Sequence, residues 1–454
     1  MIESYLLKNI AGYIDGQWVD KADSGETTEV FNPANGKTLA EIPYMAADET
    51  RRAIDAAKAA RAHVPDVKTR REWLEDCVEA LTEEKEEIGR ILCLEHGKPW
   101  KEAQGEVEYA AGFFDYCAKN IDILKPHELE EKAKDCTWTV HHRPVGVVGL
   151  ITPWNFPIGM IAKKIAPAIA ADCPSVIKPA SETPLTMIAM FQLFHERLEL
   201  PKGYVNLVMG SSSQIGGELM SSPDVTMISF TGSTEVGKLL IEQSKDHVKK
   251  LGLELGGNAP FIVFDDADID HATTQLVGNK FRGGGQTCVC ANRIYVQSGV
   301  YEEFTDKLVE KVKALKVGDG MDEDIDVGPL INKAGFEKVQ NHVADALTKG
   351  AKLVAGKHPD ELDAEKNLFY TPTVVTGVTH DMACCKEETF GPLVPMIEFD
   401  DEDEVIELGN TTEFGLASYV FTSDEKRAEK TIRGLHFGHC GWNTGTGPAP
   451  HAPF

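Results

Sequence analysis

Short runs rich in β-branched residues alternate along this chain with segments of helical periodicity. Four such runs lie between residues 145 and 230, and each is followed by a helical segment. The expected strands are 145–151, 175–178, 204–208 and 227–230, and the expected helices include 157–171 and 184–197. Repeated alternation of a buried strand and a helix is typical of a parallel sheet covered on both faces.

The same alternation starts again after Gly257, with an expected strand at 261–264 and an expected helix at 269–281. A chain of 454 residues is too long for one hydrophobic core, so two or three domains are expected. The restart of the pattern indicates that one of them is a second α/β unit. In front of them, 49–94 and 101–120 are charged, amphipathic and helical in pattern, and 136–142 alternates as a strand does.

Acidic residues exceed basic ones, with 72 Asp and Glu against 46 Lys and Arg, which gives a net charge of −26. Nucleic acids and anionic membranes bind basic surfaces, so neither is an expected partner. No apolar run reaches membrane-spanning length, and the first residues lack the pattern of a secretory leader. The expected location is the cytoplasm.

The 10 cysteines lack the density and spacing of a disulfide framework. No C-x-x-C pair faces a second one, and no H-E-x-x-H motif occurs, so a metal site is not expected. Free thiols in a reducing compartment are the simplest interpretation.

Three runs supply the groups needed for nucleophilic chemistry on a carbonyl carbon. Cys288 stands in G-Q-T-C, Glu254 in L-E-L-G-G and Asn155 in P-W-N-F-P. A thiolate attacks aldehydes, a carboxylate activates water, and an amide N–H stabilises an oxyanion. Each residue alone has a structural explanation, as a core filler, an ion-pair partner or a turn residue. Their combination favours a catalytic site.

These runs, together with K-P-A-S-E-T-P, F-T-G-S-T and E-E-T-F-G-P, resemble those of the aldehyde dehydrogenases in order and spacing. The resemblance extends from about Tyr13 to the last residue and is strongest to succinate-semialdehyde dehydrogenases and their sulfolactaldehyde-oxidising relatives. It implies an α/β fold with a Rossmann-type cofactor domain, an α/β catalytic domain and a small β hairpin for oligomerisation, in a homodimer or homotetramer. The implied boundaries are 1–123 and 146–256 for the cofactor domain, 257–436 for the catalytic domain, and 124–145 and 437–454 for the bridging segments.

The resemblance also implies the chemistry. Cys288 would attack the aldehyde, the Asn155 amide and the Cys288 backbone N–H would stabilise the oxyanion, and Glu254 would activate the water that hydrolyses the thioester. Relatives that pass the thioester to coenzyme A generally lack this glutamate, so water is the expected acceptor. A catalytically silent structural protein of the same fold is the alternative from another class, and the retention of all three residues argues against it.

NAD or NADP is the implied cofactor. Gly232 and Ser233 follow an expected strand and precede a helix, and a helix N-terminus suits a pyrophosphate. The spacing from Gly232 to Lys238 also imitates a P-loop, but Leu239 replaces the hydroxyl residue that magnesium requires. The residues implied to contact the dinucleotide are Ile151, Thr152, Pro153, Trp154, Lys178, Ser181, Gly232, Ser233, Glu388 and Phe390.

Ser181 bears on the choice between the two dinucleotides. Relatives strict for NAD often carry a glutamate at this position, which binds the ribose 2′-hydroxyl and repels a 2′-phosphate. A small neutral side chain close to Lys178 tolerates that phosphate, so both cofactors are expected to work.

The expected substrate is a small anionic aldehyde. Arg282 matches an arginine that binds the distal carboxylate in succinate-semialdehyde dehydrogenases, and a guanidinium forks onto two oxygens at once. Two other anchors of those enzymes differ, because a second arginine is Lys163 here and a serine of the last loop is Pro448. Succinate semialdehyde is the first expectation, and sulfolactaldehyde, glutarate semialdehyde and 2-oxoglutarate semialdehyde are alternatives.

Two further features leave alternatives open. Cys290 matches a residue that forms a disulfide with the catalytic cysteine in some relatives on oxidation, and a small core residue is an equally good interpretation. Relatives continue beyond the position of Phe454 with a strand that pairs with a neighbouring subunit. Without that strand, an exposed sheet edge and a weaker assembly are expected.

Overall fold

The computed structural model describes residues 1–452, which form two compact units. Unit 1 comprises 1–31, 38–95 and 103–254, and unit 2 comprises 32–37, 96–102 and the chain from 255 onward. Each unit is built around a seven-stranded sheet, so the expected pair of α/β units is confirmed. The assignment of one unit to the cofactor and the other to catalysis stays a prediction, and residues 453 and 454 of the bridging segment lie outside the described part.

The sheet of unit 1 has the strand order β11-β10-β7-β8-β9-β1-β2. The first five of these strands run parallel, and β1 and β2 continue the sheet antiparallel beside β9. The bounds are β1 Gly12–Ile14, β2 Gln17–Val19, β7 Val147–Ile151, β8 Ser175–Lys178, β9 Val205–Leu207, β10 Val225–Thr231 and β11 Lys250–Glu254. Strands β8 and β9 are buried throughout, as expected for strands with helices on both faces.

Helices connect these strands in two directions. Helices α5 and α6 carry the chain from β7 to β8 and then to β9, whereas α7 carries it back past β7 to β10. Because such crossovers are right-handed, α5 and α6 cover one face of the sheet, and α7 and α8 cover the other. The bounds are α1 Ala47–Ala60, α2 Val67–Glu83, α3 Lys85–His96, α4 Trp100–Asn120, α5 Pro157–Ala170, α6 Leu185–Arg197, α7 Ser212–Ser221 and α8 Thr234–Ser244.

The strand order of unit 1 reverses between β7 and β10. Strand pairing aligns Ile151 with both Lys178 and Phe230, and it aligns Thr231 with Glu254. The carboxyl ends of β7, β8, β10 and β11 therefore meet at one edge of the sheet. In open parallel sheets this edge, at the point where the strand order reverses, is where ligands bind.

The sheet of unit 2 has the order β14-β15-β16-β13-β12-β17-β18, and all its pairs are parallel except β14 with β15. Its strands are β12 Ala259–Val263, β13 Ala291–Gln297, β14 Lys352–Ala355, β15 Thr373–Thr376, β16 Leu393–Phe399, β17 Ala417–Phe421 and β18 His439–Trp442. Its helices are α9 Ile269–Lys280, α10 Tyr301–Ala314, α11 Lys333–Thr348, α12 Ala383–Lys386, α13 Glu402–Asn410 and α14 Glu425–Gly434.

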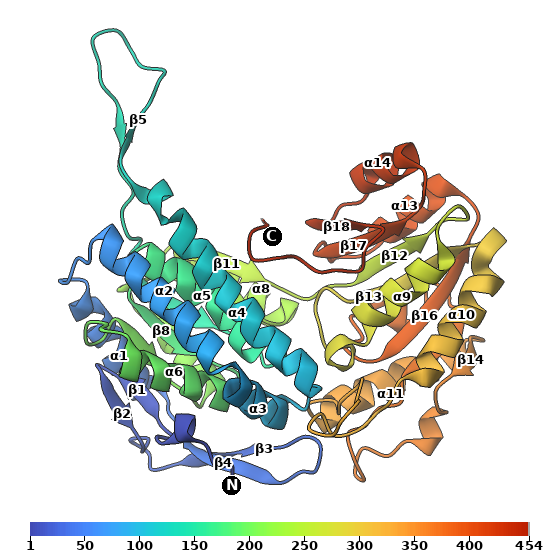
Figure 1. Cartoon of the computed structure of the whole chain (residues 1–454), viewed down its shortest axis with the longest axis horizontal. Coiled ribbons are helices and arrows are strands. Elements are labelled where there is room, and N and C mark those ends of the chain that lie inside the picture. Colours follow the sequence, from blue (N-terminus) through green and yellow to red (C-terminus); the bar gives the residue numbers. More distant parts are fainter. Residues whose placement is uncertain (453–454) are drawn as a thin grey trace. The chain divides into compact units, whose positions relative to one another are not determined.

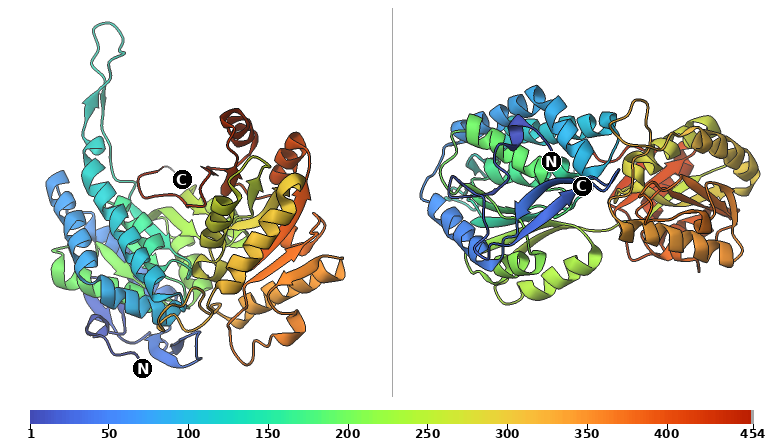
Figure 2. Two further views of the ribbon diagram at one scale, coloured as in Figure 1. Left: turned by 45° about the vertical axis from the view of Figure 1, so that its right-hand side comes forward. Right: turned by 90° about the horizontal axis from the view of Figure 1, so that it is seen from below.

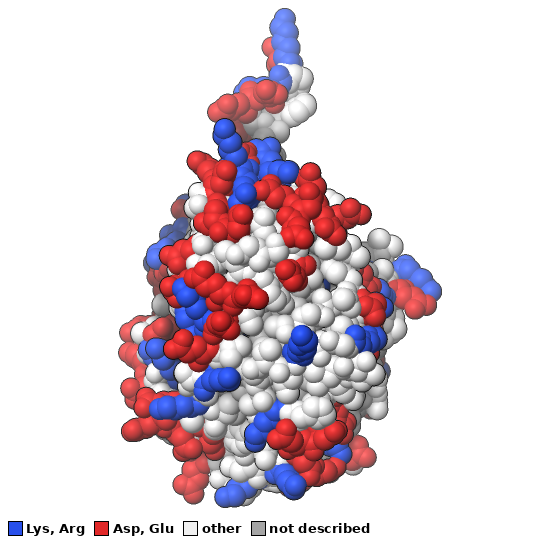
Figure 3. All heavy atoms as spheres, turned by 90° about the vertical axis from the view of Figure 1, so that its right-hand side faces the viewer, with Lys and Arg blue, Asp and Glu red and all other residues white. Residues whose placement is uncertain are grey.

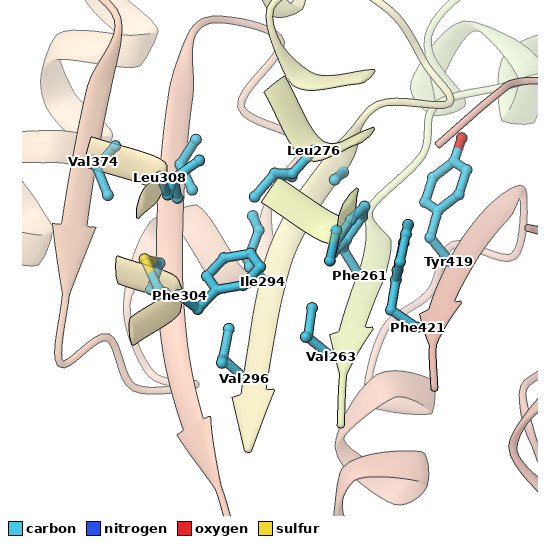
Figure 4. Packing of buried hydrophobic residues seen from close by; sticks show 14 of the residues in the cluster. Phe261, Val263, Leu276, Ile294, Val296, Phe304, Leu308, Val374, Tyr419 and Phe421 are labelled. Carbon is cyan, nitrogen blue, oxygen red and sulfur yellow. The ribbon is translucent and has the colours of Figure 1, made fainter. Parts of the chain in front are cut away.

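Two apolar clusters hold the sheet of unit 2 between its helices. On one face, Leu276 of α9 and Phe304 of α10 pack against strand residues that include Phe261 and Ile294 (Figure 4). On the other face, α11 packs against strand residues that alternate with these, among them Ile262. This alternation is the two-residue period of a strand buried on both faces. Deleting one such aromatic side chain typically costs ~3–5 kcal/mol, so the sheet is a firm base for the loops at its ends.

Two hairpins complete unit 1. Strands β3 Thr27–Phe31 and β4 Thr38–Pro43 pair antiparallel, as do β5 His127–Glu128 and β6 Thr139–Val140. The β5–β6 hairpin extends away from the rest of its unit (Figures 1 and 2). The expected hairpin is thus present, although the paired part of each strand has only two residues.

Among residues 1–452, no helix combines the length and the apolar character needed to cross a membrane. On the face drawn in Figure 3, Asp and Glu side chains surround a largely uncharged area. No broad basic patch is visible on that face, in line with the net charge of −26.

Candidate active site

Two buried hydroxyl groups mark the carboxyl edge of the unit 1 sheet. Thr152 directly follows β7 and Thr231 ends β10, the strand next to it. Within residues 1–452, neither Oγ1 atom has a hydrogen-bond partner. A buried polar group left unpaired costs ~1–3 kcal/mol, so two of them on adjacent strand ends indicate a place for a polar ligand. The predicted dinucleotide would be such a ligand.

Gly232 and Ser233 make the turn from β10 into α8. The Gly232 N–H donates to the Glu254 carbonyl oxygen over 3.1 Å, and a Cβ on Gly232 would lie 2.4 Å from the Phe230 ring. Any larger residue in this turn would require the Phe230 ring to move. Ser233 is the N-cap of α8, and its hydroxyl oxygen accepts the Val236 N–H. The positive end of the α8 helix dipole suits a pyrophosphate, as the sequence predicts.

Lys178 ends β8 at the same edge. Its Nζ lies 2.8 Å from Oγ of Ser212, in the first turn of α7. Burial lowers the pKa of Lys178, and the carboxylate of Glu182 partly opposes this effect. Ser181 is exposed three residues further on. Ser212 was not predicted from the sequence, although its place after β9, the strand next to β8, was a usable signal.

Glu254 and Lys163 form an ion pair within unit 1. Glu254 ends β11, Lys163 lies on α5, and Nζ of the lysine is 2.8 Å from Oε1 of the glutamate. Each side chain is 22% exposed. In the part of the chain that the structure describes, this is the one side-chain hydrogen bond that Glu254 makes. The structure thus brings together two residues that the sequence analysis had assigned to separate tasks.

Lys164 lies one position further along α5, on the face that Ile161 and Ile165 bury. It is 5% exposed, and its Nζ donates to Oγ of Ser229 over 3.2 Å. Burial lowers the pKa of Lys164 to about 7, the negative charge of Glu254 opposes this shift, and Lys163 reinforces it. The sequence analysis missed this residue, although its helical position among apolar neighbours was a usable signal.

Replacing Lys164 with methionine is expected to raise the melting temperature most at low pH. The pKa of Lys164 is about 7 in the folded chain and 10.5 as the ordinary value, so the unfolded chain binds more protons between these limits. The contribution of Lys164 to the free energy of unfolding therefore rises with pH across that window. Below pH ~7 the lysine is charged in both states, so the full cost of burying the charge lowers stability. The measurement is thermal unfolding of the parent and of Lys164→Met at pH ~6 and pH ~9. The stability gained by the variant should be smaller by up to ~3 kcal/mol at the higher pH.

The control is Lys68→Met, because the Lys68 side chain is 82% exposed on the same unit. That variant should differ equally little from the parent at both pH values. A Lys164→Met gain that stays constant between the two pH values would contradict the shifted pKa.

A run of three glycines shapes the loop before Cys288 in unit 2. Gly283, Gly284 and Gly285 have φ values of 59°, 67° and 76°. This left-handed region costs other residues about 1–2 kcal/mol each. The Gly283 N–H donates to the Glu102 carboxylate over 2.7 Å. Cys288 follows as a half-buried residue on a loop whose backbone is held in place.

Gly257 brings the L-E-L-G-G motif against this loop. A Cβ on Gly257 would lie 2.1 Å from the Cys288 carbonyl oxygen, so the close approach requires glycine. The Gly257 N–H also donates to Oε1 of Glu388 over 2.9 Å. These three residues precede β12, β13 and β16, so they gather at the amino-terminal edge of the unit 2 sheet.

A buried polar network fixes the loop around Glu388. The Asn292 amide donates to Oδ1 of Asn258 over 2.8 Å and accepts the Thr389 N–H over 3.3 Å. His342 lies 3.1 Å from the Thr389 hydroxyl, and burial lowers the pKa of its imidazole. Phe390 follows with a φ of 56°, an unusual conformation for a non-glycine residue. None of these supporting residues was predicted, because no local pattern connects segments so far apart.

Arg282 begins the glycine run and is exposed. A Cβ on Gly447 would lie 3.7 Å from Nη2 of Arg282, so the guanidinium lies beside the loop that contains Pro448. Cys290 is buried, with its Sγ 3.4 Å from the Gly285 carbonyl oxygen and 3.7 Å from Nζ of Lys280. Both interpretations of Cys290 stay open. Within residues 1–452, no group of three or more His, Cys, Asp or Glu side chains is arranged to hold a metal ion.

The chain is similar to known proteins over nearly its whole length. The aldehyde dehydrogenase family model matches residues 18–454. The chain is 47% identical to 3-sulfolactaldehyde dehydrogenase of Pseudomonas putida, over 99% of this chain and 92% of that protein. It is 45% identical to glutarate-semialdehyde dehydrogenase of Pseudomonas aeruginosa and to NADP⁺-dependent succinate-semialdehyde dehydrogenase of Escherichia coli, in each case over 97% of this chain and 91% of the relative.

Solved structures show the same likeness. An oxidoreductase from Marinobacter aquaeolei superimposes with a TM-score of 0.98 at 62% identity, covering 100% of this chain and 94% of that one. Betaine aldehyde dehydrogenase of Staphylococcus aureus, solved in complex with NAD⁺, superimposes with a TM-score of 0.92 at 34% identity, covering 98% and 88%. The family expected from the motifs is confirmed. The chain belongs to the aldehyde dehydrogenase family.

Proposed function

We propose that this NAD(P)-dependent aldehyde dehydrogenase oxidises a small anionic aldehyde, succinate semialdehyde first of all, to the carboxylic acid. The observation that carries the substrate class is the position of Arg282, an exposed residue at the start of the glycine run that leads to Cys288. The names of three relatives support an anionic substrate, because succinate semialdehyde, glutarate semialdehyde and 3-sulfolactaldehyde each carry an acid group. The 47% identity to the sulfolactaldehyde enzyme makes that aldehyde the second candidate.

The proposed chemistry has two stages. The Cys288 thiolate adds to the carbonyl carbon, and the resulting oxyanion accepts hydrogen bonds from the Asn155 amide and the Cys288 backbone N–H. One such donor is typically worth ~3–4 kcal/mol in the transition state. NAD(P)⁺, when bound, would accept the hydride from the substrate carbon. The substrate would then remain on Cys288 as a thioester. Glu254 then takes a proton from water, the water oxygen bonds to the thioester carbon, and the carbon–sulfur bond breaks to release the acid.

The proposed cofactor contacts come from residues at the sheet edges already described. Thr152 and Thr231 supply buried hydroxyls, Gly232 and Ser233 supply the turn into α8, and Lys178 supplies a cation for the ribose. The proposed set is completed by residues at the ends of strands and on loops: Ile151, which ends β7, Pro153, Trp154 and Ser181, on the loops after β7 and β8, and Glu388 and Phe390, before β16.

Replacing Ser181 with glutamate is expected to shift the cofactor preference toward NAD⁺. The parent enzyme should use NAD⁺ and NADP⁺ with kcat/KM values within about two orders of magnitude, roughly 2.7 kcal/mol. A carboxylate near Lys178 would repel the 2′-phosphate of NADP⁺ and accept a hydrogen bond from the 2′-hydroxyl of NAD⁺. The measurement is kcat/KM for each cofactor at saturating aldehyde.

Ser24→Glu is the matched control, because Ser24 is an exposed serine of the same unit far from this edge in sequence. It adds the same charge and should leave the cofactor ratio unchanged. An unchanged ratio in Ser181→Glu would place cofactor selectivity at other residues.

The test of the proposed function is NAD(P)H formation with succinate semialdehyde, glutarate semialdehyde, 3-sulfolactaldehyde and propanal. We expect kcat/KM for at least one anionic aldehyde to exceed that for propanal by ~10-fold or more, about 1.4 kcal/mol. Equal efficiencies would reject an anionic substrate. Absence of NAD(P)H with every aldehyde would favour the catalytically silent alternative.

We also propose that the enzyme is a cytoplasmic homo-oligomer, a dimer or tetramer, with the β5–β6 hairpin as a joining element. The support is that this hairpin carries large apolar side chains in exposed positions. Trp138 is 49% exposed and Leu129 is 37% exposed, and side chains of this kind are enriched in the cores of protein interfaces.

A further inference from the structure

Two glutamates of unit 1 are almost completely buried. Glu95 on α3 is 0% exposed and Glu106 on α4 is 3% exposed. A carboxylate that is shielded from water must be balanced by hydrogen-bond donors or by an opposite charge. The donors that surround each glutamate therefore show what it holds in place.

Glu95 accepts three hydrogen bonds from the first turn of α6. The Leu185 N–H donates to Oε2 over 2.7 Å, the Thr186 N–H donates to Oε1 over 2.9 Å, and the Thr186 hydroxyl also donates to Oε1. Burial raises the pKa of Glu95 to about 8, and the hydrogen bonds from Thr186 and Leu185 oppose this shift. Because both oxygens accept, the arrangement fits the carboxylate rather than the neutral acid.

Glu106 binds the first turn of α5 in a similar way. Its Oε1 accepts the Ile158 N–H over 3.0 Å and the Gly159 N–H over 3.1 Å. A Cβ on Gly159 would lie 3.5 Å from Cγ of Glu106 and 3.2 Å from the Tyr109 ring, so α4 packs closely against the start of α5. The two helices that follow β7 and β8 are thus both held by a buried glutamate.

Within the described part of the chain, the N-cap residues of α5 and α6 supply no side-chain hydrogen bond of their own. These residues are Phe156 and Pro184, whereas α7 and α8 in the same unit are capped by Ser211 and Ser233. The first N–H groups of a helix have no partner inside it. Helices α5 and α6 therefore receive from α3 and α4 the acceptors that α7 and α8 receive from an adjacent residue.

Both helix starts follow directly on loops of the proposed dinucleotide site. Residues 152–156 connect β7 to α5, and residues 179–184 connect β8 to α6. The Thr183 hydroxyl donates to the Trp154 carbonyl oxygen over 3.3 Å, which joins the two loops. Each loop is therefore fixed at one end by its strand and at the other end by a helix start that a buried glutamate holds.

We propose that Glu95 and Glu106 are positioning residues of the dinucleotide site: by holding the starts of α6 and α5, they keep loops 179–184 and 152–156 in the conformation that binds NAD(P). The inference rests on the proposed cofactor contacts and concerns unit 1 alone. A loop that is already in its binding conformation loses no affinity to ordering. If a loop without its glutamate adopts that conformation in about a tenth of the molecules, the dissociation constant rises ~10-fold.

The simpler alternative is that the two carboxylates only stabilise their helices. Arg70 provides the comparison, because its guanidinium is buried and donates to the carbonyl oxygen of Ala170 at the other end of α5. That end leads into β8, so it lies at the amino edge of the sheet, away from the two loops. Loss of Arg70 should lower the melting temperature without changing dinucleotide binding, and in the alternative, loss of Glu95 should do the same.

The experiment is fluorescence titration of each variant with NADPH and NADH at pH ~9, above the pKa of Glu95. Circular dichroism first confirms that each variant is folded. Glu95→Gln has one oxygen in place of two, so its amide NH₂ faces an N–H donor of α6, and its Kd should rise ~10-fold or more. Glu106→Leu should have an effect of similar size. Glu106→Gln should bind more tightly than Glu106→Leu, because it keeps an oxygen that can accept both N–H groups.

Arg70→Met is the matched control, and its Kd should stay within about twofold of the parent value. A parent-like Kd in Glu95→Gln, or an equal rise in Arg70→Met, would overturn the inference. Lys178→Met tests the proposed cofactor contacts themselves. An unchanged Kd in Lys178→Met would reject those contacts together with the inference. Weaker binding in Lys178→Met but not in Glu95→Gln would reject the inference alone.

Discussion

Replacing Cys288 with alanine is expected to abolish aldehyde oxidation, with kcat lower by ~10⁴-fold or more, while NAD(P) binding stays nearly unchanged. The thiol forms and breaks the covalent bond to the substrate carbon, and alanine offers no replacement for it. The loop should keep its shape, because glycine conformations and the Glu102 contact hold its backbone. Steady-state rates and fluorescence titration with NAD(P)H measure the two effects.

Cys290→Ala is the matched control for this variant. Cys290 lies two positions away on the same loop, but its side chain is buried against Lys280 and the Gly285 carbonyl. Its removal should cost stability of about 1 kcal/mol and leave most of the activity. Substantial turnover in Cys288→Ala, or equal loss in both variants, would reject Cys288 as the nucleophile.

The strand runs of this chain could be located from sequence because β-branched residues cluster in them. The expected strand at 175–178 coincides with β8, and the expected helix at 157–171 ends one residue earlier as α5. Pro157 explains the start of that helix, since proline suits the first helical position. Asp172, with a φ of 56°, explains the early end, because this conformation does not continue a helix.

The region 49–94 was harder to predict. Its amphipathic pattern continues across breaks, and the structure divides it into α1, α2 and α3 with a loop at 61–66. The order of the strands was not readable either, because local patterns identify a strand but not its neighbour. That β10 lies beside β7, which places Thr152 and Thr231 together, depends on packing across the whole unit.

Partnerships between distant residues were the part of the candidate site that sequence reasoning missed. Glu102 and Gly283 are 181 positions apart, and Lys163 and Glu254 are 91 apart. Each residue type has many possible partners, so the pair follows only from the fold. Lys164 was missed for another reason: lysine is usually a surface residue, and here it occupies a buried helical position.

Replacing Arg282 with alanine or glutamine is expected to raise KM for succinate semialdehyde or 3-sulfolactaldehyde by ~30-fold or more, about 2 kcal/mol. Hydrogen bonds between charged groups are typically worth ~1.5–3 kcal/mol, and an anion without its guanidinium loses that contribution. Propanal carries no anion, so its KM should change by less than about threefold, under 1 kcal/mol. The measurement is the ratio of kcat/KM between anionic and neutral aldehydes in each variant.

Arg433→Ala is the control for a lost positive charge on unit 2, because Arg433 is exposed and, within residues 1–452, pairs only with Glu429 on the preceding turn of α14. It should leave the ratio of kcat/KM between anionic and neutral aldehydes unchanged.

Arg282→Lys keeps the positive charge but not the planar guanidinium fork, so it should restore part of the selectivity. Arg282 also lies beside the loop of Gly447 and Pro448, and a purely structural role there would weaken both substrate types equally. Equal losses would therefore remove the anchor role, and the argument for an acid-bearing substrate would then rest on the relatives alone.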